Sequence, residues 1–179
     1  LLTARLVSIL AGLLMAACVY AVVASRKGEH SAVWSVAVLA TSPLFFAGAQ
    51  FANLDMLVAS FITLTLTLAI KATEAPAGKD RRLWVGAYAA AALGVLTKGA
   101  IGAVLPGAIF LIWAHFEGRP DFIRRAISLL GAAIFLAISA PWFVLMEMRF
   151  PGFNRSFFLY HHVARFLTGE FNGHMGPWF

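Results

Sequence analysis

The sequence predicts an all-α fold, a polytopic bundle of about six transmembrane helices. Of its 179 residues, 61% are hydrophobic and only 12% are charged, and the mean hydropathy is +0.83. The apolar share of a soluble domain is nearer to half. The apolar residues form long stretches separated by short polar loops, and Lys and Arg concentrate in alternate loops. These observations indicate an integral membrane protein whose surface is mostly surrounded by lipid.

The sequence also argues against a nucleic-acid-binding protein and against a protein stabilised by intrachain disulfides. The net charge of +6 could suit a nucleic-acid-binding protein, but the basic residues are scattered between apolar stretches instead of covering one soluble face. Cys18 is the only cysteine and lies inside an apolar run, so no intrachain disulfide can form.

The chain opens directly into an apolar stretch, and we expect residues 1–179 to be a single transmembrane domain, an internal fragment of a longer protein.

The first three spans follow from the length of the apolar stretches. A helix needs about 20 apolar residues to cross roughly 30 Å of hydrocarbon. We expect spans at about 6–24, 32–47 and 56–70, with Pro43 near the far end of the second. A polar loop with Pro and Gly, residues 73–82, follows the third span.

The long apolar stretch at 83–114 must contain two spans. Its 32 residues would extend about 48 Å as one helix, well beyond the hydrocarbon thickness. We expect the break at 97–102, where two glycines loosen the helix and Lys98 can reach the membrane surface. The fifth span then ends near residue 115 and the sixth covers about 126–145.

The distribution of basic residues supports this assignment. In a topology of six spans, nine basic side chains lie on one side of the membrane and five on the other. Because cytoplasmic loops carry the excess of Lys and Arg, the larger group is predicted to be cytoplasmic. It comprises Arg26, Lys27, Lys71, Lys79, Arg81, Arg82, Arg119, Arg124 and Arg125, and the exoplasmic group comprises Arg5, Lys98, Arg149, Arg155 and Arg165.

The polar residues on the exoplasmic side are the candidates for a functional site, because ionisable groups at membrane depth are expensive and usually have partners. Asp55 begins the third span, where it can cap the helix, form a structural ion pair or take part directly in a site. Lys98 lies at the tip of the predicted hairpin and can bind a substrate or extend to lipid headgroups.

The C-terminal segment 147–179 is predicted to be an exoplasmic juxtamembrane loop that contains an amphipathic helix. In a helix over 155–167, a third of the circumference would hold Arg155, His161, His162 and Arg165, with apolar residues on another arc. Two imidazoles and two guanidiniums suit a phosphate or a metal. Adjacent histidines are also common on hydrogen-bonded surfaces, and a metal site would need a third ligand.

Several motifs follow one another in a characteristic order from about Phe51 onwards. They are Asn53-Leu54-Asp55-Met56, Leu96-Thr97-Lys98-Gly99, Leu105-Pro106-Gly107, Ala140-Pro141-Trp142-Phe143, Pro151-Gly152-Phe153, Phe157-Phe158, His161-His162-Val163-Ala164-Arg165-Phe166, and His174 through Pro177-Trp178-Phe179. In this order the sequence resembles the lipid-linked-sugar glycosyltransferases of the aminoarabinose transferase and protein O-mannosyltransferase superfamily. The resemblance covers most of the chain.

This resemblance implies a GT-C fold and an activity. Members transfer a sugar from a polyprenyl-phosphate donor to lipid A, a protein or a glycan at the periplasmic side of the bacterial inner membrane. By likeness, Lys98 and Arg165 would bind the lipid phosphate, Asp55 would be a supporting residue, and one of His161 and His162 would help to hold a divalent metal. The catalytic carboxylate is expected upstream of Leu1.

A transporter or flippase for a lipid-linked anion is the alternative function. The same basic exoplasmic face could be a substrate gate, and the Pro and Gly residues near positions 43 and 99–106 fit broken helices. A transporter should place polar residues near the middle of the bilayer, where the predicted spans have few. The location of the polar side chains therefore distinguishes the two functions.

Overall fold

The computed structural model describes residues 2–51, 53–76 and 78–157, and these residues form nine helices and no strand. The chain divides into two compact units, Leu1–Ser139 and Ala140–Phe179. The first unit contains α1 (Leu2–Lys27), α2 (Glu29–Thr41), α3 (Pro43–Gln50), α4 (Leu54–Glu74), α5 (Arg81–Lys98), α6 (Ile101–Phe116), α7 (Pro120–Ala126) and the start of α8 (Leu129–Arg149). The rest of α8 and α9 (Phe153–Arg155) belong to the second unit.

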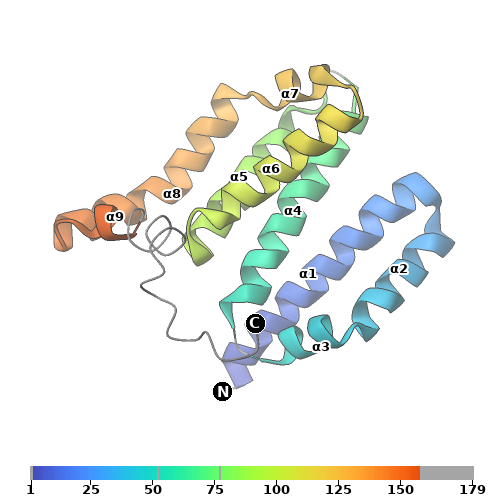
Figure 1. The fold of residues 1–179 in the computed structure, drawn as a ribbon, viewed down its shortest axis with the longest axis horizontal. Coiled ribbons are helices and arrows are strands. Elements are labelled where there is room, and N and C mark those ends of the chain that lie inside the picture. The colour runs from blue at the N-terminus through green and yellow to red at the C-terminus, as the bar shows by residue number, and fades with distance from the viewer. Residues whose placement is uncertain (1, 52, 77, 158–179) are drawn as a thin grey trace, which may run out of the picture. The chain divides into compact units, whose positions relative to one another are not determined.

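Helix α4 is the centre of the first unit. It packs against α1 on one side and against α5 and α6 on the other, and α1 in turn packs against α2 and α3. Figure 1 shows α4 between α1 and α5. The short connections make α5 antiparallel to both α4 and α6, and the ends of α1, α4, α5 and α6 gather at two opposite ends of the unit (Figure 1).

The predicted second span is a bent pair of helices. Helices α2 and α3 meet at an angle of 68°. Pro43 is the first residue of α3, and Ser42 before it has an extended backbone. Proline lacks an amide hydrogen and disfavours the helical conformation of the residue that precedes it, so the helix cannot continue through this position. The sequence located the proline but did not predict the size of the bend.

The predicted hairpin within residues 83–114 is confirmed. Helix α5 ends at Lys98, Gly99 has φ 80°, and α6 begins at Ile101. The two helices approach closely just behind the turn, where a Cβ atom on Gly102 would lie 2.2 Å from the backbone carbon of Gly94. Glycine is therefore required at position 102 by the close packing of the two helices, and at position 99 it permits the positive φ of the turn.

The all-α membrane bundle is confirmed, whereas the count of six crossings stays a prediction. Within the described ranges, three segments are long and apolar enough to cross a membrane: Arg5–Lys27, Leu54–Glu74 and Leu129–Arg149. The bent pair α2 and α3 makes a fourth if it is one crossing. Helix α6 has 16 residues, which extend about 24 Å, less than the hydrocarbon thickness of about 30 Å.

Candidate functional site

Asp55 and Lys98 meet at one end of the first unit. Lys98 is the last residue of α5, and its Nζ donates a hydrogen bond to Oδ1 of Asp55 in the first turn of α4. The two side chains remain 50% and 68% exposed. The structure therefore brings together two of the predicted site residues and leaves both accessible to a ligand.

The first turn of α4 is held in place by its neighbours. Asn53, and not Asp55, is the N-cap, because its side-chain oxygen accepts the amide hydrogen of Met56 at 2.9 Å. The amide of Asn53 donates to Oγ of the buried Ser8 at 3.4 Å, which joins this end of α4 to α1. Asp55 lies in the first turn of α4, where its charge complements the helix dipole, and it forms the ion pair with Lys98, whereas its direct part in a site stays a prediction. The roles of Asn53 and Ser8 were missed, although Asn before a helical stretch is a recognisable cap signal.

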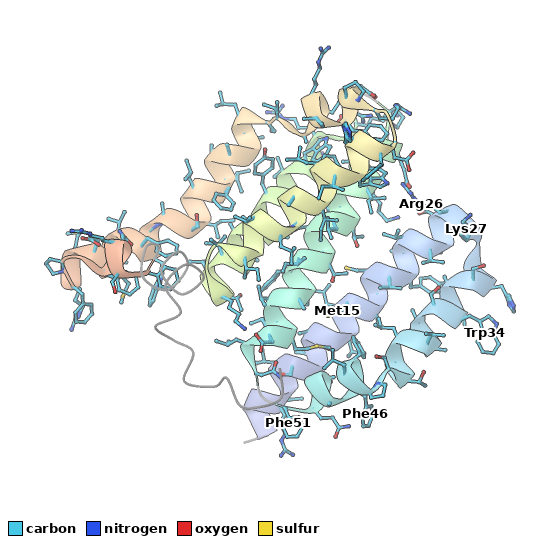
Figure 2. The ribbon with its side chains drawn as sticks, in the orientation of Figure 1. Met15, Arg26, Lys27, Trp34, Phe46 and Phe51 are labelled. Carbon is cyan, nitrogen blue, oxygen red and sulfur yellow. The ribbon has the colours of Figure 1, made fainter. Side chains whose placement is uncertain are left out.

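A pocket of about 640 Å³ adjoins Asp55. Helix α1 contributes Met15, the α2–α3 bend contributes residues from Leu39 to Phe51, and the start of α4 contributes Asn53 to Ala59. Its lining is mainly apolar, with polar groups at Ser42, Asn53 and Asp55. Figure 2 labels Met15 and Phe51 of this region and, at the other end of α1, Arg26 and Lys27. A mainly apolar pocket with a few polar groups is typical of a ligand site.

The predicted cytoplasmic loops meet at the opposite end of the unit. Nε of Arg26 donates to Oε1 of Glu74 at 2.8 Å, which joins the C-terminal ends of α1 and α4. Arg125 of α7 contacts the carboxylate of Asp80 before α5. The basic loops that the sequence assigned to one side of the membrane are therefore adjacent in space, as the predicted topology requires.

Arg125 has a structural role that the sequence did not reveal. Its guanidinium donates to the carbonyl oxygens of Ala72, Thr73 and Ala75 and to Asp80, at 2.7 to 3.2 Å. These carbonyl groups lie at the C-terminal end of α4, where they lack partners within the helix. A cation at this end also interacts favourably with the helix dipole. Nothing in the sequence distinguishes Arg125 from Arg124, because the contact depends on how α7 packs against α4.

Asp80 completes this network at the start of α5. It accepts hydrogen bonds from the amide of Gly78 at 3.0 Å and from Nε1 of Trp84 at 3.1 Å, in addition to Arg125. Burial acts to raise the pKa of the Asp80 carboxyl, but the hydrogen bonds from Arg125, Gly78 and Trp84 outweigh it and hold the pKa below its usual value. The carboxylate is thus ionised at neutral pH.

Glu147 stabilises the start of the predicted exoplasmic loop, within the second unit. The carboxylate of Glu147 accepts the amide hydrogens of Gly152 and Asn154, each at 2.8 Å. These contacts fix the turn at Gly152, which has φ 89°. Glu147 is therefore engaged in local structure at the end of α8.

The remaining predicted site residues, His161, His162 and Arg165, lie outside the described residues, as does most of the predicted amphipathic helix. No group of three or more His, Cys, Asp or Glu side chains suited to a metal occurs in residues 2–51, 53–76 and 78–157. The metal predicted at His161 and His162 stays a prediction, and the described residues do not form a site for it by themselves.

The sequence is similar to a known protein family over most of its length. Residues 1–145 match the family model described as dolichyl-phosphate-mannose-protein mannosyltransferase. The chain is 30% identical over 148 residues to undecaprenyl phosphate-alpha-4-amino-4-deoxy-L-arabinose arabinosyl transferase 1 of Proteus mirabilis, covering 81% of the chain and 26% of that protein. For the transferase of the same name from Pseudomonas fluorescens, the identity is 28%, over 73% of the chain and 23% of that protein.

The structure also resembles a solved one. It superimposes on ArnT from Cupriavidus metallidurans bound to undecaprenyl phosphate with a TM-score of 0.85 and 29% sequence identity, covering 90% of this chain and 30% of that one. The apo state of the same protein gives a TM-score of 0.82. The chain spans about a quarter of the length of the first two relatives.

Proposed function

Because the chain belongs to the dolichyl-phosphate-mannose-protein mannosyltransferase family, we propose that it is part of an integral membrane glycosyltransferase. The whole protein transfers a sugar from a polyprenyl-phosphate donor to an acceptor, which is lipid A, a protein or another glycan. The site faces the periplasm of a bacterial inner membrane, on the side opposite to the larger group of basic loops. The names of the relatives support undecaprenyl phosphate as the carrier and an aminopentose as the sugar.

The exposed contact between Lys98 and Asp55 is the observation that supports this function. An ammonium group has three donors, and Lys98 uses one of them on Asp55. The other two remain for the oxygens of a lipid phosphate. The N-terminal end of α4, with the partial positive charge of its helix dipole, lies beside this lysine. An anionic leaving group is stabilised by this arrangement.

The proposed transfer inverts the configuration of the sugar. A carboxylate that we place upstream of Leu1 takes the proton of the acceptor hydroxyl, and the oxygen attacks the anomeric carbon. The bond between this carbon and the phosphate oxygen breaks, and its electron pair remains on the phosphate. Lys98 and Arg165 then stabilise the negative charge of the departing lipid phosphate. Asp55 positions Lys98, and the pocket beside it takes an apolar part of one lipid substrate.

Transport of a lipid-linked anion is supported less well. The bend between α2 and α3 fits a broken transporter helix. However, several hydroxyls inside α4 donate to carbonyls of their own helix, as Ser60 does to Leu57 and Thr63 to Ala59. The predicted spans also lack Asp, Glu, Lys and Arg between their ends. The described helices therefore do not form a polar path along which an anion could cross the membrane.

Replacement of Lys98 in the full-length protein tests the proposal. We expect Lys98→Met to lower kcat/KM for sugar transfer by roughly 100-fold or more, the effect of removing one donor to a developing negative charge, and Lys98→Arg to retain part of the activity. Arg165→Ala should abolish transfer without preventing membrane insertion. Lys27→Met is the matched control, because Lys27 is exposed at the opposite end of the unit. Unchanged transfer by Lys98→Met would contradict the proposed role.

A further inference from the structure

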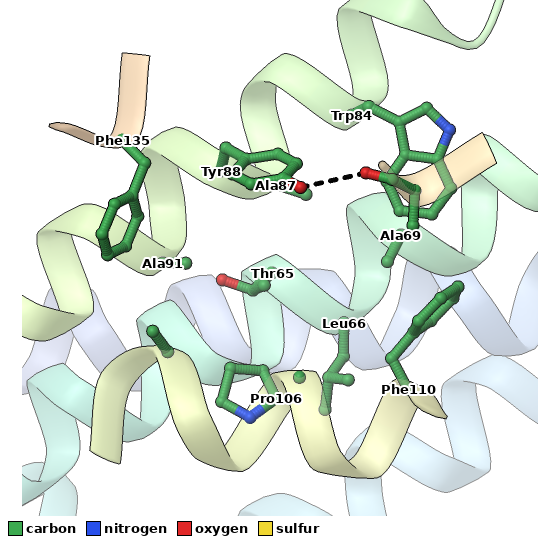
Figure 3. Close-up of a pocket in the computed structure, with 13 residues that line it drawn as sticks. Thr65, Leu66, Ala69, Trp84, Ala87, Tyr88, Ala91, Pro106, Phe110 and Phe135 are labelled. Carbon is green, nitrogen blue, oxygen red and sulfur yellow. Dashed lines mark hydrogen bonds between the residues drawn. The ribbon is translucent and has the colours of Figure 1, made fainter. Parts of the chain in front are cut away.

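A second pocket lies at a distance from the Asp55 end. This cavity of about 320 Å³ lies among α4, α5 and α6, with Ala126 of α7 and Phe135 of α8 also in its lining (Figure 3). Its two hydroxyl groups are already engaged, because Thr65 donates to Phe61 and Tyr88 to Ala126. The other side chains that line it are apolar or, in Trp84, have a polar hydrogen already donated to Asp80. The cavity therefore suits an apolar occupant.

Two of the helices that line this cavity, α5 and α7, carry exposed basic side chains at the predicted cytoplasmic end. Arg81 precedes the cavity residue Trp84 by three positions and so lies on the same face of α5. Arg124 belongs to α7, which contributes Ala126 to the cavity lining, and it lies three positions before the exposed Ile127. Both arginines are exposed, and neither forms an ion pair with a described residue. Arg125, in contrast, is engaged by α4 and Asp80.

Exposed apolar side chains follow Arg124 within a few positions. Ile127 is 76% exposed and Leu129 is 89% exposed, immediately after α7. An exposed apolar surface next to exposed cations is typical of the boundary between hydrocarbon and lipid headgroups. At the same end of the unit, the described segments hold nine basic side chains and five acidic ones, which gives a net charge of +4. A ligand of this region therefore has an apolar part and a negative charge.

We propose that an anionic phospholipid of the cytoplasmic leaflet binds here. One acyl chain occupies the cavity among α4, α5 and α6, and the phosphate lies beside Arg81 and Arg124. The cavity volume is at the lower end of the range of about 300–1,000 Å³ for small-molecule sites, and clusters of basic residues on the cytoplasmic side of a span recognise anionic headgroups. This site is separate from Lys98 at the other end of α5, and it does not depend on the proposed glycosyl transfer.

Native mass spectrometry of the full-length protein in detergent tests the site, with phosphatidylglycerol and phosphatidylcholine of identical acyl chains as probes. We expect the protein to retain phosphatidylglycerol in preference to phosphatidylcholine. The double variant Arg81→Gln/Arg124→Gln should weaken retention of phosphatidylglycerol about 25-fold, since each basic side chain near an anionic headgroup contributes about fivefold. The variant Arg81→Lys/Arg124→Lys, which keeps both charges, should retain most of the binding.

Two further variants separate the cavity from general charge attraction. Gly107 lines the cavity, and a Cβ atom there would meet no atom within 4 Å. Gly107→Leu should fill the space and weaken retention of both lipids. Lys27→Gln removes an exposed charge at the same end, on a helix that contributes nothing to the cavity, and should leave retention unchanged. Equal losses with Lys27→Gln and with the arginine variants, or equal retention of the two lipids by the unaltered protein, would overturn the proposal.

Discussion

The ammonium of Lys98 contacts the carboxylate of Asp55, which joins the end of α5 to the start of α4 across 43 positions of sequence. Both side chains are at least half exposed. An exposed ion pair of this kind contributes about 1 kcal/mol or less to stability. The main effect of this ion pair is therefore to orient Lys98 towards a bound anion, and its effect on folding stability is small.

Exchange of the two charges separates these effects. Asp55→Lys/Lys98→Asp restores an ion pair but moves the cation from α5 to α4. We expect thermal unfolding in detergent to change by about 1 kcal/mol or less, while sugar transfer by the full-length protein falls as far as in Lys98→Met. If the exchanged pair restored transfer, then the position of the cation would be unimportant and Lys98 would not bind the phosphate directly.

Arg125 should be important for stability in a way that its neighbour is not. Arg125→Gln removes the partner of the largely buried Asp80 and of three carbonyl oxygens at the end of α4. We expect a loss of about 3–5 kcal/mol, because one partner of a buried pair is left behind. Arg124→Gln is the matched control, since Arg124 is exposed, and should change stability by less than about 0.5 kcal/mol. Unfolding by heat or denaturant in detergent without anionic lipid measures both variants, and equal effects would contradict the network.

The Asp80 network should also make stability depend on pH. The pKa of Asp80 is lower in the folded protein than in the unfolded chain, so its contribution is fully present above the unfolded pKa of about 3.9. It is lost as the pH falls through the lower, folded pKa. The difference in unfolding free energy between the unaltered protein and Asp80→Asn should therefore shrink as the pH is lowered from 7 to 3. A difference that stays constant over this range would show that ionised Asp80 does not contribute.

The close approach of α5 and α6 can be tested with two glycines of one helix. Gly102→Ala places a methyl group 2.2 Å from the backbone of Gly94, so the hairpin must open, and we expect a loss of about 1–3 kcal/mol from overpacking. Gly107→Ala meets open space and should stabilise the protein by about 0.5–1 kcal/mol, because alanine favours a helix. Thermal unfolding measures both, and a stabilising Gly102→Ala would show that the helices lie further apart.

The predicted orientation in the membrane can be tested by cysteine labelling. The predicted cytoplasmic loop at residues 73–82 contains Gly78, but its φ of 89° would strain a cysteine there. The exposed neighbour Lys79 is therefore the better position for the label. In a Cys18→Ala background, Lys79→Cys should react with a membrane-impermeant reagent only after the inner face is opened. Leu54→Cys at the start of α4 should react from the periplasmic side, because Leu54 is 60% exposed. The reverse pattern would invert the topology.

Much of the fold could be predicted because hydropathy and helix breaks are local properties. The break near Gly99 follows from the length of an apolar stretch, and Pro43 marks the end of α2 through its own covalent geometry. The bend of 68° could not be predicted, since it depends on how α3 packs against α1. The functional candidates Asp55 and Lys98 were found because charged residues at the ends of spans are rare and stand out.

The sequence by itself determined that this is a membrane-embedded helical protein, where most of its helices begin and end, and which end carries the excess of basic loops. Each of these properties is encoded within a few turns of chain. Only the tertiary structure decided that Asp55 pairs with Lys98, and that Arg125 rather than Arg124 binds Asp80. Such contacts join residues more than 40 positions apart, and they depend on the rotation and spacing of packed helices, which a local pattern does not specify.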